Sequence, residues 1–314
     1  MGNAIEVTGL TKAYGPLKAV DGIDFTVAQG EVFSFLGPNG AGKTTTTEIL
    51  EGLRRASSGT VQVLGLDPWT ESPALLRRIG VIPQDFHYFP RATPREAIGL
   101  YSGLFGVPSR AEEILRQVGL TDKADSYYET LSGGQHRKVG LSLALVNNPE
   151  VCFLDEPTTG LDPQARRAMW EVIGGLRREG RTVFLTTHYL DEAERLSDRI
   201  AIIDHGRIVA AGRPADIIAR FGAGERLRIV AAPEMAEYLR RHGDLPVDTA
   251  NGTIEVRLRS KEDALRALEV IQASGFPWSS FSTVQDSLED VFIRLVGRIE
   301  DGAVASAGPP KGAP

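Results

Sequence analysis

The feature that most limits the folds open to this chain is a glycine-rich segment of the form G-x-x-x-x-G-K-[ST]. Its residues are Gly37, Pro38, Asn39, Gly40, Ala41, Gly42, Lys43 and Thr44. Glycines allow backbone N–H groups to converge on an anion, while Lys43 can reach the outer phosphates of a nucleotide and the Thr44 hydroxyl can meet Mg²⁺. The segment by itself predicts only that a nucleotide binds.

The residues around this segment predict how it is held. Glu31–Leu36 is a short apolar run that ends at glycine, which indicates a buried strand. Residues Thr44–Leu53 are typical of a helix, and its N-terminus would direct the positive end of the helix dipole at the phosphates. A strand, a phosphate loop and a helix in this order indicate an α/β fold.

The first 220 residues continue this pattern, because short apolar runs alternate with segments of helical periodicity. The predicted strands are Val32–Leu36, Arg78–Ile82, Val151–Leu154, Thr182–Thr186 and Ile200–Asp204. Such alternation predicts a single α/β domain with a largely parallel sheet.

A helical insertion is expected at about residues 90–145. Thr93-Pro94-Arg95-Glu96 has the form of a capping box with proline at the first helical position. The helix that it begins should run through Ile98, Leu100 and Leu104.

The pattern changes near residues 221–224, and a small α+β domain is predicted over 221–300. Its expected strands are Leu227–Ala231, Thr253–Leu258 and Ser279–Val284, and its expected helices are Met235–Arg241, Asp263–Ala273 and one that begins near Ser287. The role of this domain stays open between dimer stabilisation and regulation. Residues 301–314 are mostly Gly, Ala and Pro, so we expect a disordered tail.

An apolar stripe marks the last predicted helix. Its members are Leu288, Val291, Phe292, Leu295 and Val296. Packing against the small domain's own sheet explains this stripe better than a docking face for a partner does.

Composition narrows the classes of function. The net charge is −6 and no basic block is present, which argues against nucleic acid as the main partner. The single cysteine, Cys152, lies in an apolar run and is expected to be a buried core residue in a reducing compartment. No apolar run approaches the ~20 residues of a membrane span, and the N-terminus lacks a signal-peptide pattern. We therefore expect a soluble, cytoplasmic chain.

Two acids end the run Val151–Leu154, which places them at the edge of the sheet where ligands bind. Asp155 can hold Mg²⁺ directly or through water, and Glu156 can act as a general base on an attacking water. A solvated turn would be the ordinary interpretation of an Asp-Glu pair. The four apolar residues before it and the phosphate loop favour the catalytic one.

Three further residues have settings that suggest contact with a nucleotide. His188 follows a strand expected to flank the Asp155 strand, so it can donate a hydrogen bond to the γ-phosphate or to the water. Gln84 ends another apolar strand and could touch the metal or the water. Tyr14 could stack on the adenine ring.

A final motif, Leu131-Ser132-Gly133-Gly134-Gln135, lies between the phosphate loop and Asp155. With Gly160-Leu161-Asp162 and the residues above, it gives the chain the motif content and order of an ATP-binding cassette (ABC) ATPase, which residues 1–220 resemble. The resemblance implies that ATP and Mg²⁺ are the cofactors, with Thr44, Gln84 and Asp155 at the metal and Thr45 added to the nucleotide contacts. It also implies that Ser132, Gly133, Gly134 and Gln135 cover ATP held by another subunit, and that Asp162 links the two sites.

The resemblance further implies two protein partners. One is a second copy in a head-to-tail ATP-sandwich dimer, and the other is a membrane-spanning permease received by the loop after Gln84 and the helical insertion. Glu51–Arg55 and Ser287–Phe292 look like the daunorubicin-resistance type of exporter ATPase, whose permease is a separate polypeptide. The chain would then lie at the cytoplasmic face of the membrane.

Two other functions compete with an exporter ATPase. A soluble cassette ATPase acting on ribosomes or DNA usually has two cassettes, a long coiled coil or zinc fingers, and none is visible in this sequence. A phosphotransferase kinase would leave Leu131–Gln135 and His188 without a role.

Overall fold

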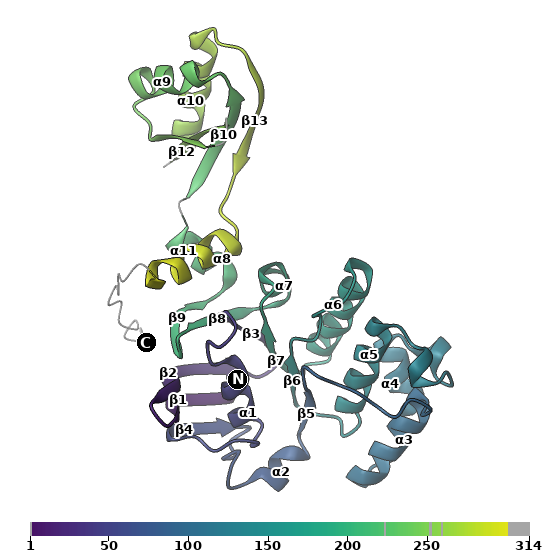
Figure 1. The fold of residues 1–314 in the computed structure, drawn as a ribbon. Helices are drawn as coiled ribbons and strands as arrows, with labels where there is room; N and C mark the ends of the chain where they lie inside the picture. The colour runs from purple at the N-terminus through teal and green to yellow at the C-terminus, as the bar shows by residue number, and fades with distance from the viewer. Residues whose placement is uncertain (1, 223, 251–252, 259, 301–314) are drawn as a thin grey trace. The chain divides into compact units, whose positions relative to one another are not determined.

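A computed structural model describes residues 2–222, 224–250, 253–258 and 260–300 (Figure 1). The chain divides into two compact units, Met1–Pro214 and Ala215–Pro314. The boundary expected near residue 220 falls inside the helix α8 (Pro214–Phe221). The predicted tail, 301–314, lies outside the described residues.

The centre of the first unit is a six-stranded sheet in the order β5-β6-β7-β3-β8-β9. The strands are β3 (Val32–Leu36), β5 (Ile79–Ile82), β6 (Val151–Asp155), β7 (Thr182–Thr187), β8 (Arg199–Asp204) and β9 (Arg207–Gly212). All neighbouring strands are parallel except β9, which runs antiparallel to β8. The five predicted strands are confirmed with small shifts at their ends, while β9 was not predicted.

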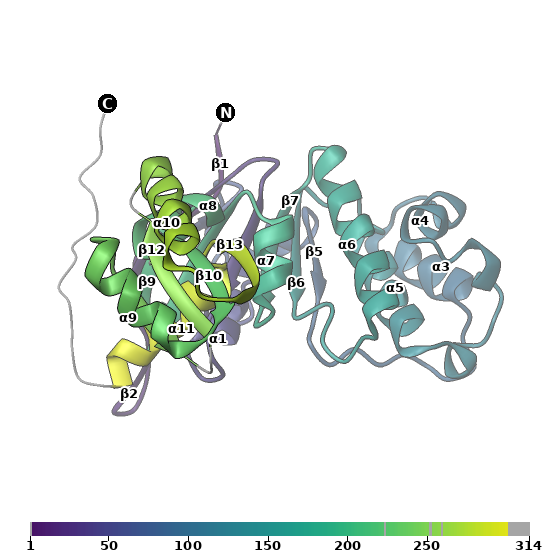
Figure 2. The same ribbon diagram turned by 90° about the horizontal axis from the view of Figure 1, so that it is seen from above.

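Side chains alternate between two cores on the two faces of this sheet. On β6, Cys152 and Leu154 enter one core, which also holds residues of α3 (Pro94–Phe105), α4 (Ala111–Val118), α5 (Gly133–Ala144) and α6 (Pro163–Arg178). Val151 and Phe153 enter the other core, which holds residues of α1 (Lys43–Leu50). Figures 1 and 2 show β5 and β6 between α1 and α5 in both views.

The capping box predicted at Thr93 is confirmed at the start of α3, where Thr93 Oγ1 accepts from the backbone N–H of Glu96. Two short helices complete the first unit, α2 (Ser72–Leu76) and α7 (Leu190–Leu196), together with 3-10 turns at Thr121–Lys123 and Tyr128–Thr130.

A three-stranded antiparallel sheet, β2-β1-β4, was not predicted. Its strands are β1 (Asn3–Tyr14), β2 (Leu17–Ala28) and β4 (Ser58–Val63). Buried residues alternate with exposed ones along these strands, as expected of a sheet with one covered face. Register shifts interrupt the pairing of β1 with β2, so the alternation is broken in the sequence as well.

From β10 to β13 the second unit has the element order β-α-β-β-α-β, followed by one more helix, and its strands are arranged β11-β12-β10-β13. Its elements are β10 (Glu225–Ala231), α9 (Pro233–His242), β11 (Val247–Ala250), β12 (Thr253–Leu258), α10 (Lys261–Ser274), β13 (Trp278–Val284) and α11 (Leu288–Glu300). Residues of α9 and α10 share one core with β10 and β12. The predicted elements are confirmed, and β11 was missed.

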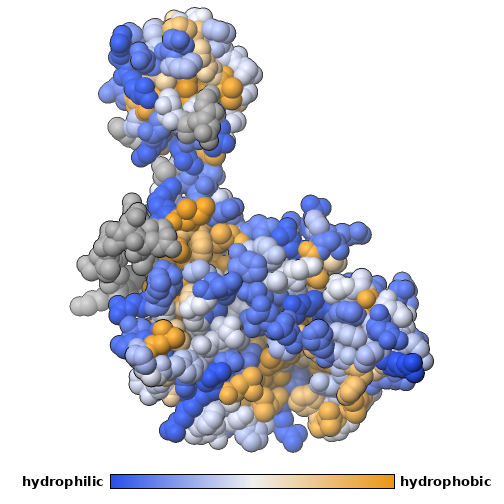
Figure 3. Space-filling model, viewed as in Figure 1, coloured by the Kyte–Doolittle hydropathy of each residue, from blue (hydrophilic) through white to orange (hydrophobic). Residues whose placement is uncertain are grey.

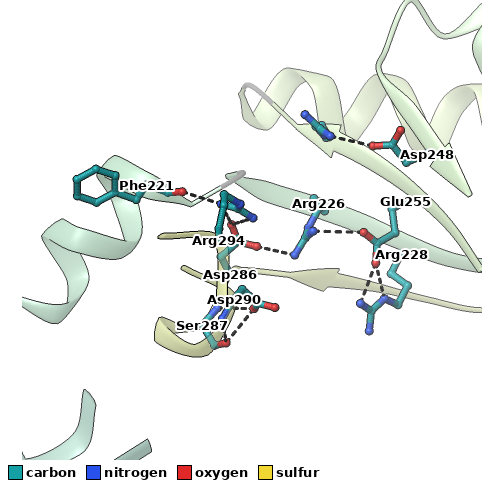
Figure 4. A network of polar contacts seen from close by, with 10 residues as sticks. Phe221, Arg226, Arg228, Asp248, Glu255, Asp286, Ser287, Asp290 and Arg294 are labelled. Atoms are coloured by element: carbon teal, nitrogen blue, oxygen red, sulfur yellow. Dashed lines mark hydrogen bonds and ion pairs between the residues drawn. The ribbon is translucent and has the colours of Figure 1, made fainter. Parts of the chain in front are cut away.

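The packing predicted for the last helix was wrong. Leu288 and Val291 are buried, but they do not belong to the described core of the small sheet. Instead Arg294 joins α11 to α8, because its guanidinium donates to the carbonyl of Phe221 at 2.6 Å (Figure 4). Asp286, whose side chain is 1% exposed, lies between Arg294 and Arg226 of β10. This buried carboxylate therefore links α11 to β10, while Arg294 also holds α11 to the end of α8.

A pair of glycines tests the packing of the first unit. An ideal Cβ on Gly80 of β5 would lie 2.1 Å from the Ala144 carbonyl oxygen, while one on Gly99 of α3 meets no heavy atom within 4 Å. We expect Gly80→Ala to lower the free energy of unfolding by about 1–3 kcal/mol. Gly99→Ala should raise it by about 0.5–1 kcal/mol. Urea denaturation of the two variants measures both, and equal effects would contradict the packing of α5 on β5.

Candidate active site

The phosphate loop joins β3 to α1, and two of its glycines are required by close contacts. An ideal Cβ on Gly37 would lie 2.2 Å from the carbonyl oxygen of Ile203 on β8. One on Gly42 would lie 2.4 Å from the carbonyl oxygen of Ala19, and Gly42 also has φ +107°. The loop is therefore pressed against the backbone of the neighbouring segments, where only glycine fits.

Lys43 begins α1 and is 6% exposed. Its ammonium donates to the carbonyl oxygens of Gly37 at 2.8 Å and Pro38 at 3.1 Å. Burial lowers the pKa of Lys43, while the negative charges of Glu156 and Asp155 oppose this shift. The loop thus carries a partly desolvated cation, which would interact more strongly with phosphate than a hydrated one would.

The pairing of β6 with β7 fixes the two predicted acids. Asp155 lies opposite Thr186, whose hydroxyl donates to Asp155 Oδ1. Glu156 has φ +46°. Its backbone N–H donates to Thr186, with 3.1 Å from the nitrogen to both the carbonyl oxygen and the hydroxyl oxygen of that residue. A non-glycine residue in the left-handed region is strained unless its surroundings hold it there. Thr186 supplies that restraint.

The electrostatics at Asp155 suit a divalent cation. Burial raises the pKa of Asp155, the Thr186 hydrogen bond lowers it, and Glu156 raises it further. A cation beside this carboxylate would favour its charged form. Carboxylate and hydroxyl oxygens are ligands that Mg²⁺ prefers, so Asp155 and the exposed Thr44 could hold it.

Three groups surround the Glu156 carboxylate. Gln84 Nε2 lies 3.3 Å and Thr159 Oγ1 3.0 Å from Oε2, while His188 Nδ1 lies 3.2 Å from Oε1. Glu156 itself is 7% exposed, and the His188 side chain is 40% exposed. The structure therefore brings together the three residues predicted to be catalytic, Gln84, Glu156 and His188.

Sequence reasoning missed three residues of this site. Thr186 and Thr159 hold the two acids, and the only sequence signal for Thr186 was a polar residue at the end of an apolar strand. Glu51 at the end of α1 is 5% exposed, and burial, with smaller contributions from Asp155 and Glu48, raises its pKa to about 8. No local pattern in the sequence marks Glu51 as buried.

Tyr14, at the end of β1, is 40% exposed. The Lys12 ammonium lies 5.2 Å and the Arg54 guanidinium carbon 5.4 Å from its ring centroid. Arg54 follows α1, so the predicted stacking residue is connected to the helix of the phosphate loop.

Two predicted sets of residues lie apart from the phosphate loop. Ser132 caps α5, accepting from the backbone N–H of Gln135, and Asp162 caps α6, accepting from Gln164 and Ala165. Both helices belong to the core on the opposite face from α1. Their N-termini approach each other closely, because a Cβ on Gly134 would lie 2.8 Å from that of Ala165.

Comparison with known sequences identifies the family. The family model for ABC transporters matches residues 20–159. The daunorubicin/doxorubicin resistance ATP-binding protein DrrA of Streptomyces peucetius is 39% identical over 309 residues, covering 95% of this chain and 94% of the relative. The chain belongs to the ATP-binding subunits of ABC transporters. The Nod factor export ATP-binding protein I of Ralstonia nicotianae is 36% identical over 310 residues, covering 94% of each chain.

Solved ABC cassettes match about two thirds of this chain. A structure of an ATP-binding subunit of an ABC transporter has a TM-score of 0.62 and 30% identity, covering 70% of this chain and 93% of that one. A dimeric cassette in a post-hydrolysis state, bound to ADP and phosphate, has a TM-score of 0.60 and 27% identity, covering 67% and 98%.

Membership of this family gives the chain a general activity. It binds ATP and is an ATPase coupled to transport. ABC ATP-binding subunits work with a transmembrane permease and form dimeric cassettes. Among the described residues, no helix has the length and apolar character needed to cross a bilayer.

The contacts of Glu156 lead to a prediction for hydrolysis. Glu156→Gln keeps the size of the side chain and its contacts with Thr159 and Gln84, but it removes the base. We expect ATP binding to be retained and turnover to fall by about 10²-fold or more. Phosphate release and binding of a fluorescent ATP analogue measure the two effects. Hydrolysis at the wild-type rate would exclude Glu156 as the base.

Proposed function

We propose that this chain is the ATP-hydrolysing subunit of an exporter and that two copies close head to tail over two ATP molecules. ATP binding would close the pair and hydrolysis would reopen it, moving a separate permease. The observation that carries this proposal is the placement of Leu131–Gln135. This segment begins α5 on one face of the sheet, whereas the phosphate loop leads into α1 on the other.

A single copy therefore presents two halves of a site in different places. Ser132 and Gly133 are exposed at the N-terminus of α5, where backbone N–H groups favour an anion. The close approach of Gly134 to Ala165 puts this N-terminus beside that of α6, which Asp162 caps. Both segments expected to face the partner copy are thus adjacent, which supports one shared dimer surface.

Within each copy, the proposed roles follow the geometry. Residues 37–45 would surround the phosphates, and Tyr14 would stack on adenine. Asp155, Thr44 and Gln84 would hold Mg²⁺, which supplies charge neutralisation for the departing phosphate. Glu156 would activate the water, with His188 donating to the γ-phosphate.

A groove of about 660 Å³ supports a permease docking site after Gln84. Its lining residues are Tyr88, Phe89, Pro90, Arg91, Ala92, Glu96 and Leu100. Phe89 is 68% exposed and Leu100 is 50% exposed, which is unusual for large apolar side chains that cluster together. Figure 3 shows hydrophobic surface over α3 on this side of the unit. A short amphipathic segment of the permease would cover it.

The relatives suggest the direction and cargo of transport. One is named for daunorubicin and doxorubicin resistance and another for Nod factor export, so export of a drug or other hydrophobic compound is the function that we propose. The chain would then lie at the cytoplasmic face of the membrane, held there by the permease.

Mixing two inactive variants tests the composite site. Lys43→Ala removes the main cation of the phosphate loop, and Ser132→Arg blocks the segment that covers ATP. Each homodimer should be inactive, but a mixed dimer has one intact site made from the unaltered half of each chain. Random mixing gives about half mixed dimers, so roughly a quarter of wild-type hydrolysis should return if the sites act independently.

Strict cooperativity between the sites would conceal this recovery, so ATP-driven dimerisation of the mixture is followed by size-exclusion chromatography as well. If neither hydrolysis nor dimerisation exceeds that of the separate variants, the composite site is refuted and a self-contained ATP site replaces it.

The groove makes a separate prediction. Phe89→Ser with Leu100→Ser should reduce co-purification with host membranes by about tenfold, because anchors in an apolar pocket contribute most of the affinity of an interface. Nucleotide binding and basal hydrolysis should be unchanged. Leu265→Ser, which alters another exposed leucine in the second unit, is the matched control. Loss of ATP binding in the groove variant would assign this segment to the nucleotide site.

A further inference from the structure

The helices α6 and α7 each begin next to a proposed functional residue. Asp162 caps α6, and α7 begins at Leu190, directly after His188 and Tyr189. In the proposed dimer, Asp162 faces the partner copy and His188 faces the γ-phosphate of the chain's own ATP. Any contact that fixes one helix to the other therefore connects the two sites.

Arg166 on α6 makes such contacts. Its backbone N–H donates to the Asp162 carbonyl at 2.9 Å, so it lies one helical turn from the cap. Its guanidinium carbon is 5.3 Å from the ring centroid of Tyr189, and Nη2 is 3.4 Å from Asp191 Oδ2. Tyr189 in turn lies beside His188, with 4.3 Å between ring centroids.

A buried contact lies beneath this layer. The Trp170 indole N–H donates to Glu192 Oε1 at 2.8 Å, and the two residues are 7% and 0% exposed. Arg166 also lies over the Trp170 ring, at 5.3 Å from its centroid. Trp170 is on α6 and Glu192 on α7, so the surface contacts of Arg166 rest on a buried link between the same two helices.

We propose that Arg166 is a positioning residue that couples His188 to Asp162. Occupation of the γ-phosphate site would then determine the position of the loop that ends at Asp162 and faces the partner copy. The inference rests on the proposed function. A guanidinium suits this role because it is planar and rigid, which lets it stack on two rings while it keeps an ion pair. Arg166 meets Trp170 on its own helix and Tyr189 and Asp191 on the other chain segment.

The test uses the full chain carrying Glu156→Gln, in which ATP should hold the dimer closed. The measured quantity is the ATP concentration at half-maximal dimerisation. We expect Arg166→Met to raise it by about tenfold, since it removes two ring contacts and an ion pair. Arg166→Lys keeps the charge and should give a smaller increase.

Two measurements separate positioning from loss of structure. The melting temperature of the Arg166→Met variant should differ from that of its parent by no more than about 2–4 °C, as for a modest change at the surface. In chains that also carry Ser132→Arg, which cannot complete a dimer, affinity for a fluorescent ATP analogue should be unchanged by Arg166→Met.

The matched control is Arg195→Met. Arg195 lies over the same Trp170 ring at 5.2 Å, but it is on α7 and C-terminal to the Tyr189 and Asp191 contacts. It should change the dimerisation midpoint by less than about twofold. An effect equal to that of Arg166→Met would reduce Arg166 to packing on Trp170 and overturn the inference.

A double-mutant cycle with His188→Ala decides whether Arg166 acts through His188. If it does, Arg166→Met should have less than about a twofold effect in the His188→Ala background. A full effect in that background, or none in the parent, refutes the coupling. If the Glu156→Gln parent itself fails to dimerise with ATP, the proposed function fails and the inference fails with it; binding of the fluorescent analogue then shows whether ATP still binds.

Discussion

The parallel pairing of β7 with β3 on one side and β6 on the other is the constraint on which the candidate site depends. Leu36 lies opposite Thr187, and Asp155 lies opposite Thr186. The phosphate loop, Glu156 and His188 directly follow these paired residues in the chain, so they leave the sheet at the same edge as Asp155. A shift of one residue in the β6–β7 register would turn Thr186 away from Asp155, since neighbouring residues of a strand face opposite sides.

Burial near this edge desolvates several ionisable groups. Asp155 and Glu156 are less than a tenth exposed, as is Glu51 at the end of α1, and the buried Lys43 interacts electrostatically with Asp155 and Glu156. The raised pKa of Asp155 and of Glu51 and the lowered pKa of Lys43 express the same cost of desolvation. Mg²⁺ with a phosphate chain would supply charges of both signs, so the site is suited to the pair better than to either alone.

The two faces of the sheet have different tasks in the proposed mechanism. The α1 face binds the nucleotide, and the helices of the other face carry the segments that would meet the partner copy and the permease. Contacts within the second face, such as the approach of Gly134 to Ala165 and the layer around Arg166, determine how those segments are held. The second unit is organised separately, with Asp286 joining β10 to α11.

The sequence by itself determined the parallel strands, the phosphate loop, the acids and the capped helix at Thr93. Buried parallel strands are continuous apolar runs, and loops and caps require particular residues at fixed spacings, so both are visible locally. It did not reveal the antiparallel sheet, whose alternation is broken by register shifts, nor the packing of α11, which depends on Asp286 meeting Arg294. Only the tertiary structure decided that Thr186 and Thr159 hold the acids and that Leu131–Gln135 and α1 occupy opposite faces of the sheet. A strand's alternation shows that it has two faces, but which helices cover each face depends on contacts between segments far apart in the chain.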